Sequence, residues 1–111
     1  MNLEFYVKED NLIVIMEGEL DHHSTEEVRN KIDNQLDVEG MNKLILDFSK
    51  ISFMDSSGIG VVIGRYKKLH AKKGNLCIVG VSPSVRRVFE LSGMFKIIGL
   101  YDNIEEAVQN I

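Results

Sequence analysis

The sequence has one cysteine, one proline and no tryptophan in 111 residues. The lone Cys77 excludes an intramolecular disulfide and a zinc site made of several cysteines, and the apolar run NLCIVGV around it indicates a buried, inert thiol. No apolar run approaches the roughly 20 residues that span a bilayer. The first ten residues, MNLEFYVKED, lack the basic start and apolar stretch of a signal peptide. We therefore expect a reduced, soluble protein of the cytoplasm.

An excess of positive charge is also absent. The formal net charge is −4, the pI is about 5.3, and the 13 lysines and arginines are scattered. This balance argues against direct binding of nucleic acid. The length favours one domain, residues 1–111, with a single core.

Several catalytic and cofactor motifs are missing. The chain has no G-x-x-x-x-G-K-[ST] phosphate loop and no G-x-S-x-G nucleophile elbow. A phospho-receiver domain could use Asp55, but it needs an acidic pair after the first strand, where this sequence predicts a hairpin. Asp21, His22 and His23 make a poor metal site, because adjacent histidines on a turn point apart. We expect no metal and no cofactor.

A small serine hydrolase is the alternative from another functional class. A catalytic triad is recognised by geometry and not by sequence order, and all three residue types are present. Against it, a chain of this size leaves little room for a substrate pocket beside its core. The candidate residues are Ser56 or Ser57, His22 or His23, and Asp21 or Asp55.

Hydrophobic periodicity alternates between strand and helix patterns. This alternation predicts an α/β fold: a mixed, mostly parallel sheet with an N-terminal hairpin at its edge, covered by about four helices. The predicted strands are residues 3–7 and 12–20, joined by a break at 8–11, and residues 43–48, 75–81 and 96–101. Capping boxes predict that one helix begins at Ser24, with Glu27, and that the last begins at Asp102, with Glu105. The helix after the serines should end at Gly74. A further helix should run from Ser82 and Pro83 to Gly93.

Two loops at strand ends stand out, ELDHHST (residues 19–25) and FMDSSGIG (residues 53–60). In parallel sheets, functional residues gather where strands end and helices begin, so we expect these loops to be neighbours. A hydroxyl at a helix N-terminus lies where the backbone dipole favours an anion, so a phosphoserine would be tolerated there. Capping of the helix by Asp55, Ser56 or Ser57 is the simpler interpretation for one of them.

The helix after the serines carries three glycines, although glycine costs about 1 kcal/mol in a helix relative to alanine. At 100° per residue, Gly60 and Gly64 lie away from the predicted core stripe. Their bare face would let another backbone approach, either a partner protein or a loop of this chain. The predicted stripe is Ile59, Val62, Ile63, Tyr66 and Leu69.

Three segments resemble the anti-anti-sigma factors of sporulating Gram-positive bacteria, which have the STAS domain fold. They are GELDHH (residues 18–23), FMDSSGIGVVIGRYK (residues 53–67) and SPSVRRVFELSGMFKII (residues 82–98). The resemblance runs along the whole chain, and no departure occurs at these motifs. It implies a regulatory protein that is not an enzyme.

The resemblance also implies a mechanism. The unphosphorylated protein would bind an anti-sigma factor that is also a serine kinase, carrying ATP or ADP, and thereby free a sporulation sigma factor. The kinase would phosphorylate the first serine of the D-S-[ST]-G motif, Ser56, and a PP2C-type phosphatase would restore the free hydroxyl. Asp21 matches a position that contacts the kinase. A general stress anti-anti-sigma factor would share this chemistry.

We call the predicted partner-binding residues the switch surface. We expect the free chain to be a monomer that presents this surface to its partners. The switch surface comprises Asp21, His22, Asp55, Ser56, Ser57, Gly58, Ile59, Gly60 and Gly64.

Overall fold

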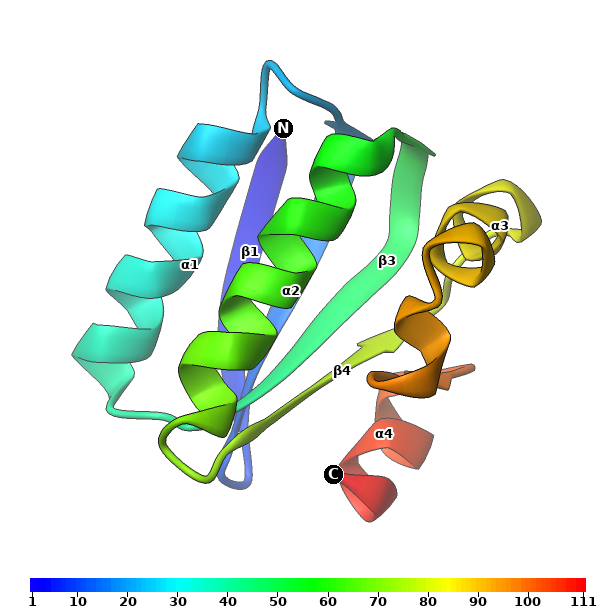
Figure 1. Cartoon of the computed structure of the whole chain (residues 1–111). Helices are drawn as coiled ribbons and strands as arrows, with labels where there is room; N and C mark the ends of the chain where they lie inside the picture. Colours follow the sequence, from blue (N-terminus) through cyan, green and yellow to red (C-terminus); the bar gives the residue numbers. More distant parts are fainter.

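Five strands and four α-helices form the fold, and the computed structural model describes all residues 1–111 (Figure 1). In chain order they are β1 (Asn2–Lys8), β2 (Asn11–Leu20), α1 (Thr25–Glu39), β3 (Lys43–Met54), α2 (Ser56–His70), β4 (Asn75–Val79), α3 (Pro83–Ser92), the 3₁₀ helix η1 (Met94–Lys96), β5 (Gly99–Tyr101) and α4 (Ile104–Asn110). The sheet order is β1-β2-β3-β4-β5. Only β1 and β2 pair antiparallel. The predicted α/β class, mostly parallel sheet and hairpin edge are confirmed.

The two faces of the sheet carry cores of different size. Helices α1, α2 and α3 cover one face, over a cluster of 21 buried residues that includes Val14 and Phe89. Helix α4 packs on the other face, over five buried residues that include Ile13 and Cys77. Consecutive strand residues point to opposite faces, so strands buried on both sides appear as continuous apolar runs.

Cys77 lies in the smaller cluster and is 2% exposed. Burial raises the pKa of its thiol to about 12, so the reactive thiolate is absent at neutral pH. The predicted buried thiol is confirmed. No helix of the chain combines the length and the apolar character that crossing a bilayer requires.

Four strand predictions need correction. Strand β4 ends at Val79, before the predicted end at residue 81. Strand β3 continues to Met54, past the predicted end at residue 48, because its second half pairs with the second half of β2 after shifts in register. The hairpin turn is shorter than residues 8–11, since Lys8 and Asn11 still pair. The last strand is limited to Gly99–Tyr101, because η1 occupies part of the predicted 96–101 segment.

Neither predicted capping box is formed. Ser24 is the N-cap residue of α1, but it makes no capping hydrogen bond, because its hydroxyl is bonded to the backbone of Glu19 and Asp21. For α4 the cap is Asn103, one residue after Asp102, and its side chain accepts the N–H of Glu106 at 2.8 Å.

Both predicted ends of α3 are confirmed, whereas the predicted C-terminal end of α2 is wrong. Ser82 accepts the N–H of Val85, and Gly93 ends the helix with φ of 77°. Helix α2 ends at His70, before the predicted stop at Gly74. Gly74 serves a different purpose, because a Cβ there would collide with the carbonyl group of Asn42.

The core face of α2 is rotated from the predicted stripe. Val62 and Leu69 are buried as predicted, but Ile59, Ile63 and Tyr66 are only partly buried at the margin of the cluster. The buried face is completed by Gly58, Val61 and Arg65. Sequence periodicity missed this face because it contains an arginine.

Arg65 is buried because it joins α2 to α1. Its side chain is 8% exposed, and its Nε lies 2.9 Å from Oδ1 of Asp33 on α1. Burial lowers the pKa of Arg65, and the charge of Asp33 opposes this shift. The ion pair therefore offsets the desolvation of the Arg65 charge. It joins two helices that lie side by side on the same face of the sheet (Figure 1).

Asp33→Ala should destabilise the fold by about 1–3 kcal/mol, because it leaves the buried guanidinium unpaired. Asp37→Ala is the matched control on the same helix, since Asp37 makes only an exposed pair with Lys68 at 3.8 Å. Its expected cost is below about 1 kcal/mol. Urea unfolding of the three proteins provides the measurement, and equal losses would contradict this role for Arg65.

Candidate functional site

The two loops singled out in the sequence meet at one edge of the sheet. Leu20 and Met54, the last residues of β2 and β3, pair with each other. The backbone N–H of Asp55 donates to the carbonyl of Leu20 at 3.3 Å, and His22 Nδ1 lies 3.9 Å from Asp55 Oδ2. The predicted proximity of the loops is confirmed.

Asp55 is the N-cap of α2. Its Oδ1 accepts the N–H of Ser57 at 2.9 Å and also accepts the hydroxyl of Ser57. The hydrogen bond from the Ser57 hydroxyl is the largest cause that lowers the pKa of Asp55, and the Ser57 N–H and His22 act in the same direction. Asp55 is therefore a carboxylate at neutral pH, placed where the positive end of the helix favours one.

The two serines occupy different environments. Ser56 is the first residue of α2, its side chain is exposed, and its hydroxyl has no hydrogen-bond partner within the chain. Ser57 is half-buried and bonded to Asp55. Ser56 thus presents the accessible nucleophilic oxygen of this loop.

Asp21 organises the neighbouring loop. Its Oδ1 accepts the backbone N–H groups of His23 at 3.0 Å and Ser24 at 3.2 Å. The hydroxyl of Ser24 in turn accepts the N–H of Asp21. His22 projects from this turn with an exposed side chain. Its ring is tilted by 39° against that of His23, with centroids 3.9 Å apart, so the expectation that the two side chains point apart is wrong.

The glycines of α2 divide between its two faces. A Cβ on Gly60 or Gly64 would meet no atom within 4 Å, which confirms that these glycines lie away from the core. Gly58 is buried, and a Cβ there would lie 2.5 Å from Met54 Cγ and 3.2 Å from Leu20 Cδ2. The missing side chain of Gly58 therefore admits the strand ends beneath it, and its place on the switch surface stays a prediction.

Sequence reasoning missed one apolar residue near the site. Phe53 is 49% exposed and pairs with Glu19, and these two residues are the first of the two loop segments. The prediction ended this strand at residue 48, so Phe53 was not placed on the sheet edge. The signal in the sequence that could have identified Phe53 is its position close to Asp55. Ile59 is only partly buried and adds a second apolar group on α2.

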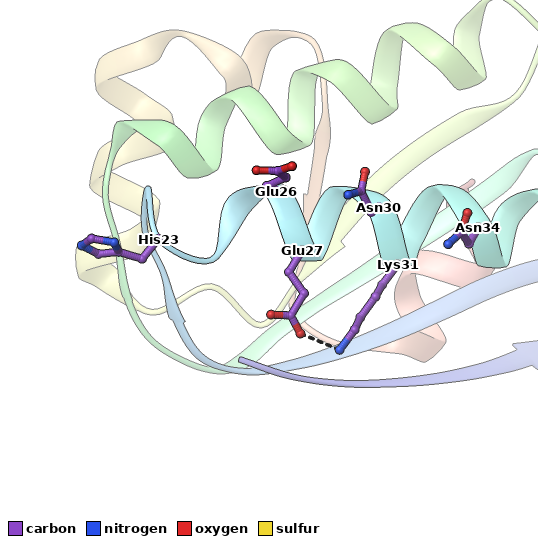
Figure 2. A pocket seen from close by; sticks show the side chains of 6 residues that line it. All are labelled: His23, Glu26, Glu27, Asn30, Lys31 and Asn34. Carbon is purple, nitrogen blue, oxygen red and sulfur yellow. Dashed lines mark hydrogen bonds and ion pairs between the residues drawn. The ribbon is translucent and has the colours of Figure 1, made fainter.

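Neither hollow of the surface contains the serines. The larger, about 520 Å³, runs along the outside of α1, where Glu27 and Lys31 form an ion pair at 2.6 Å (Figure 2). It is lined by His23, Glu26, Glu27, Asn30, Lys31 and Asn34. The smaller, about 250 Å³, lies beside α4 and is lined by Asp47, Ser49, Val79, Gly80 and residues 102–105. A substrate cavity beside Ser56 is therefore absent.

The groups of the suggested triad are not assembled. His22 approaches Asp55, but no histidine makes a hydrogen bond to Ser56 or Ser57. The proton of the Ser57 hydroxyl is directed to a carboxylate and not to an imidazole base. No cluster of three potential metal ligands occurs in the chain.

Comparison with known proteins identifies the family. The STAS domain model matches residues 2–107. The chain belongs to the STAS domain family. The resemblance seen in the three sequence motifs is thereby confirmed at the level of the family.

Within the STAS family, the chain is similar over its whole length to anti-sigma factor antagonists. It is 38% identical to the anti-sigma F factor antagonist of Paenibacillus polymyxa, covering 100% of this chain and 97% of the relative. It is 32% identical to the anti-sigma-B factor antagonist of Listeria monocytogenes, covering 95% and 93%. The chain is an antagonist-type STAS protein, a regulatory binding protein and not an enzyme.

Solved structures support the same assignment. The anti-sigma factor antagonist SpoIIAA in its unphosphorylated form is 34% identical, with a TM-score of 0.83 over 96% of this chain and 93% of that one. The Bacillus cell fate determinant SpoIIAA in the phosphorylated form is also 34% identical, with a TM-score of 0.75 over 97% of both chains.

Alanine at Gly58 and at Gly60 should have opposite effects on stability. Gly58→Ala forces Met54 and Leu20 to move and should cost about 1–3 kcal/mol. Gly60→Ala enters open space and should gain up to about 1 kcal/mol of helix propensity. Urea unfolding tests both, and stabilisation by Gly58→Ala would contradict the observed packing.

The contribution of Asp55 to stability should depend on pH. Because the pKa of Asp55 is lowered in the folded protein, its contribution is complete above the ordinary value of 3.8. It should be lost as the pH falls from 3.8 through the folded-state pKa, where the folded carboxylate also becomes protonated. We expect the difference in unfolding free energy between wild type and Asp55→Asn to shrink across this window. A constant difference in acid urea titrations would argue against this account.

Proposed function

We propose that the protein is a phosphorylation-switched antagonist of an anti-sigma factor. The unphosphorylated form binds an anti-sigma factor that is also a serine kinase, with ATP or ADP bound, and the sigma factor is released. Phosphorylation of Ser56 ends the binding, and a PP2C-type phosphatase restores it. The free protein acts as a cytoplasmic monomer.

The observation that carries the proposal is the free hydroxyl of Ser56 at the start of α2. The kinase would transfer the γ-phosphoryl group of ATP to Ser56 Oγ: the oxygen–phosphorus bond forms, the bond to ADP breaks, and the hydroxyl proton passes to a base of the kinase. The chain itself supplies only an exposed acceptor on a rigid helix end. The relatives solved in unphosphorylated and phosphorylated forms support such a cycle.

Electrostatics support a switch that acts on binding and leaves the fold intact. A phosphate adds about −1.5 to −2 charge, which the N-terminus of α2 tolerates. The same charge would be placed beside Asp55 on the switch surface of a chain with net charge −4. A partner surface built for a neutral hydroxyl would then have to desolvate this charge without a matching cation. Each 1.4 kcal/mol lost is a tenfold loss of affinity.

Control of a sporulation sigma factor is the form of the proposal that we favour, because the relative named for sigma F is 38% identical. The alternative is the general stress pathway, supported by the 32% identical relative named for sigma B. Both share the same chemistry. Capture of one of the two cognate kinases in preference to the other distinguishes them.

The protein should gain one phosphate when it is incubated with the cognate kinase, ATP and Mg²⁺. Mass spectrometry should map the phosphate to Ser56 and find none on Ser56→Ala, which should stay bound to the kinase in gel filtration. Ser84→Ala, which alters another exposed serine in the first turn of a helix, should behave as wild type. Undiminished phosphorylation of Ser56→Ala would refute the site, and an acyl adduct with an activated ester would favour the hydrolase.

A further inference from the structure

Asp55 distinguishes two adjacent serines that the sequence presents as equivalent. We propose that Asp55 is a positioning residue that selects the phosphoacceptor by holding the hydroxyl of Ser57 and leaving that of Ser56 free. The inference rests on the proposed phosphorylation of this loop. It adds a determinant of site choice that lies in the substrate and not in the kinase.

The hydrogen bonds of Ser57 carry the first step of the argument. Both its N–H, at 2.9 Å, and its hydroxyl are directed to the same oxygen, Asp55 Oδ1. A hydrogen bond to a carboxylate is stronger than one between neutral groups. To attack the γ-phosphorus of ATP, the Ser57 oxygen would have to turn outward and give up this bond. Ser56 is exposed and has no bond to break.

A carboxylate beside a hydroxyl could also serve as its general base. The pKa of Asp55 is lowered, chiefly by the Ser57 hydroxyl itself and further by the Ser57 N–H and His22. A carboxylate whose pKa is lowered is a weak base at neutral pH, since the best general bases have pKa values near the working pH. The contact therefore holds the hydroxyl of Ser57 and does not activate it.

Contacts with Leu20 and His22 in the neighbouring loop fix the orientation of Asp55. Its backbone N–H donates to the carbonyl of Leu20 at 3.3 Å, which anchors it to the end of β2. His22 Nδ1 lies 3.9 Å from Oδ2, the carboxylate oxygen that Ser57 does not use. Oδ1 thus remains directed at Ser57 across the start of α2.

Removal of the carboxylate should make Ser57 a second acceptor. In Asp55→Ala, the Ser57 oxygen can form the bond to the γ-phosphorus while the bond to ADP breaks and the proton passes to the kinase base. We expect the share of phosphate on Ser57 to rise about tenfold or more. The double variant Ser56→Ala/Asp55→Ala should accept phosphate on Ser57, whereas Ser56→Ala alone should not.

Two matched variants separate site selection from loss of the cap. Ser56→Ala/Asp55→Asn keeps an oxygen acceptor for Ser57 and should remain largely unmodified. Asn103→Ala removes the cap of α4, on the opposite face of the sheet, and should leave all phosphate on Ser56. Phosphate confined to Ser56 in Asp55→Ala would overturn the inference. So would the absence of phosphate from both serines of that variant, since Asp55 would then act in kinase recognition.

A measurement without the kinase tests the same contact. In proton NMR at low temperature, the hydroxyl proton of Ser57 should exchange slowly enough to be seen in wild type and in Asp55→Asn, and should be lost in Asp55→Ala. Rapid exchange in wild type would overturn the inference even if Ser56 is the acceptor. If the hydroxyl proton of Ser57 is protected but no kinase phosphorylates the protein, the contact between Ser57 and Asp55 stands. The proposed function is then refuted.

Discussion

The hydrogen bond from the Asp55 N–H to the Leu20 carbonyl extends the pairing of β2 and β3 beyond the end of both strands. The rest of the site depends on this pairing. Because the strands are parallel, both loops leave the sheet at the same edge, and the register places Leu20 opposite Met54. A slip of one residue would reverse the side-chain directions of a strand and separate His22 from Asp55.

One carboxylate then performs three tasks at this edge. Asp55 caps α2, engages the Ser57 hydroxyl and faces His22 across the loops. As a consequence, one serine is part of the local structure and the other is free for a partner. The loop can therefore carry a modifiable hydroxyl without giving up the hydrogen bonds that start the helix.

Helix α2 presents the serine from a fixed support. On its buried side, Gly58 admits Met54 and Leu20, and Arg65 is paired with Asp33 on α1. On its open side, Gly60 and Gly64 have no neighbour within 4 Å of a Cβ position. A protein that is recognised by a partner needs such a rigid, uncovered helix end, and it does not need a cavity. Both hollows of the surface lie away from this helix end.

Local and periodic signals in the sequence were sufficient for the alternation of strands and helices, the ends of α3 at Ser82 and Gly93, and the family motifs. They also placed Gly60 and Gly64 away from the core, although the core stripe used for that angle was itself rotated from the buried face. The full length of β3, the burial of Gly58 and Arg65, and the difference between Ser56 and Ser57 required the tertiary structure. Arg65 is buried against Asp33, which is distant in sequence, and Gly58 is buried against the nearby Met54 and the distant Leu20. The Asp55–Ser57 bond is local, but a D-S-S-G sequence allows either hydroxyl to bond, and the orientation of Asp55 is set by β2 and His22. The sequence shows which residues are able to form a contact. The tertiary structure determines which of these contacts forms, and a contact that forms prevents the alternatives.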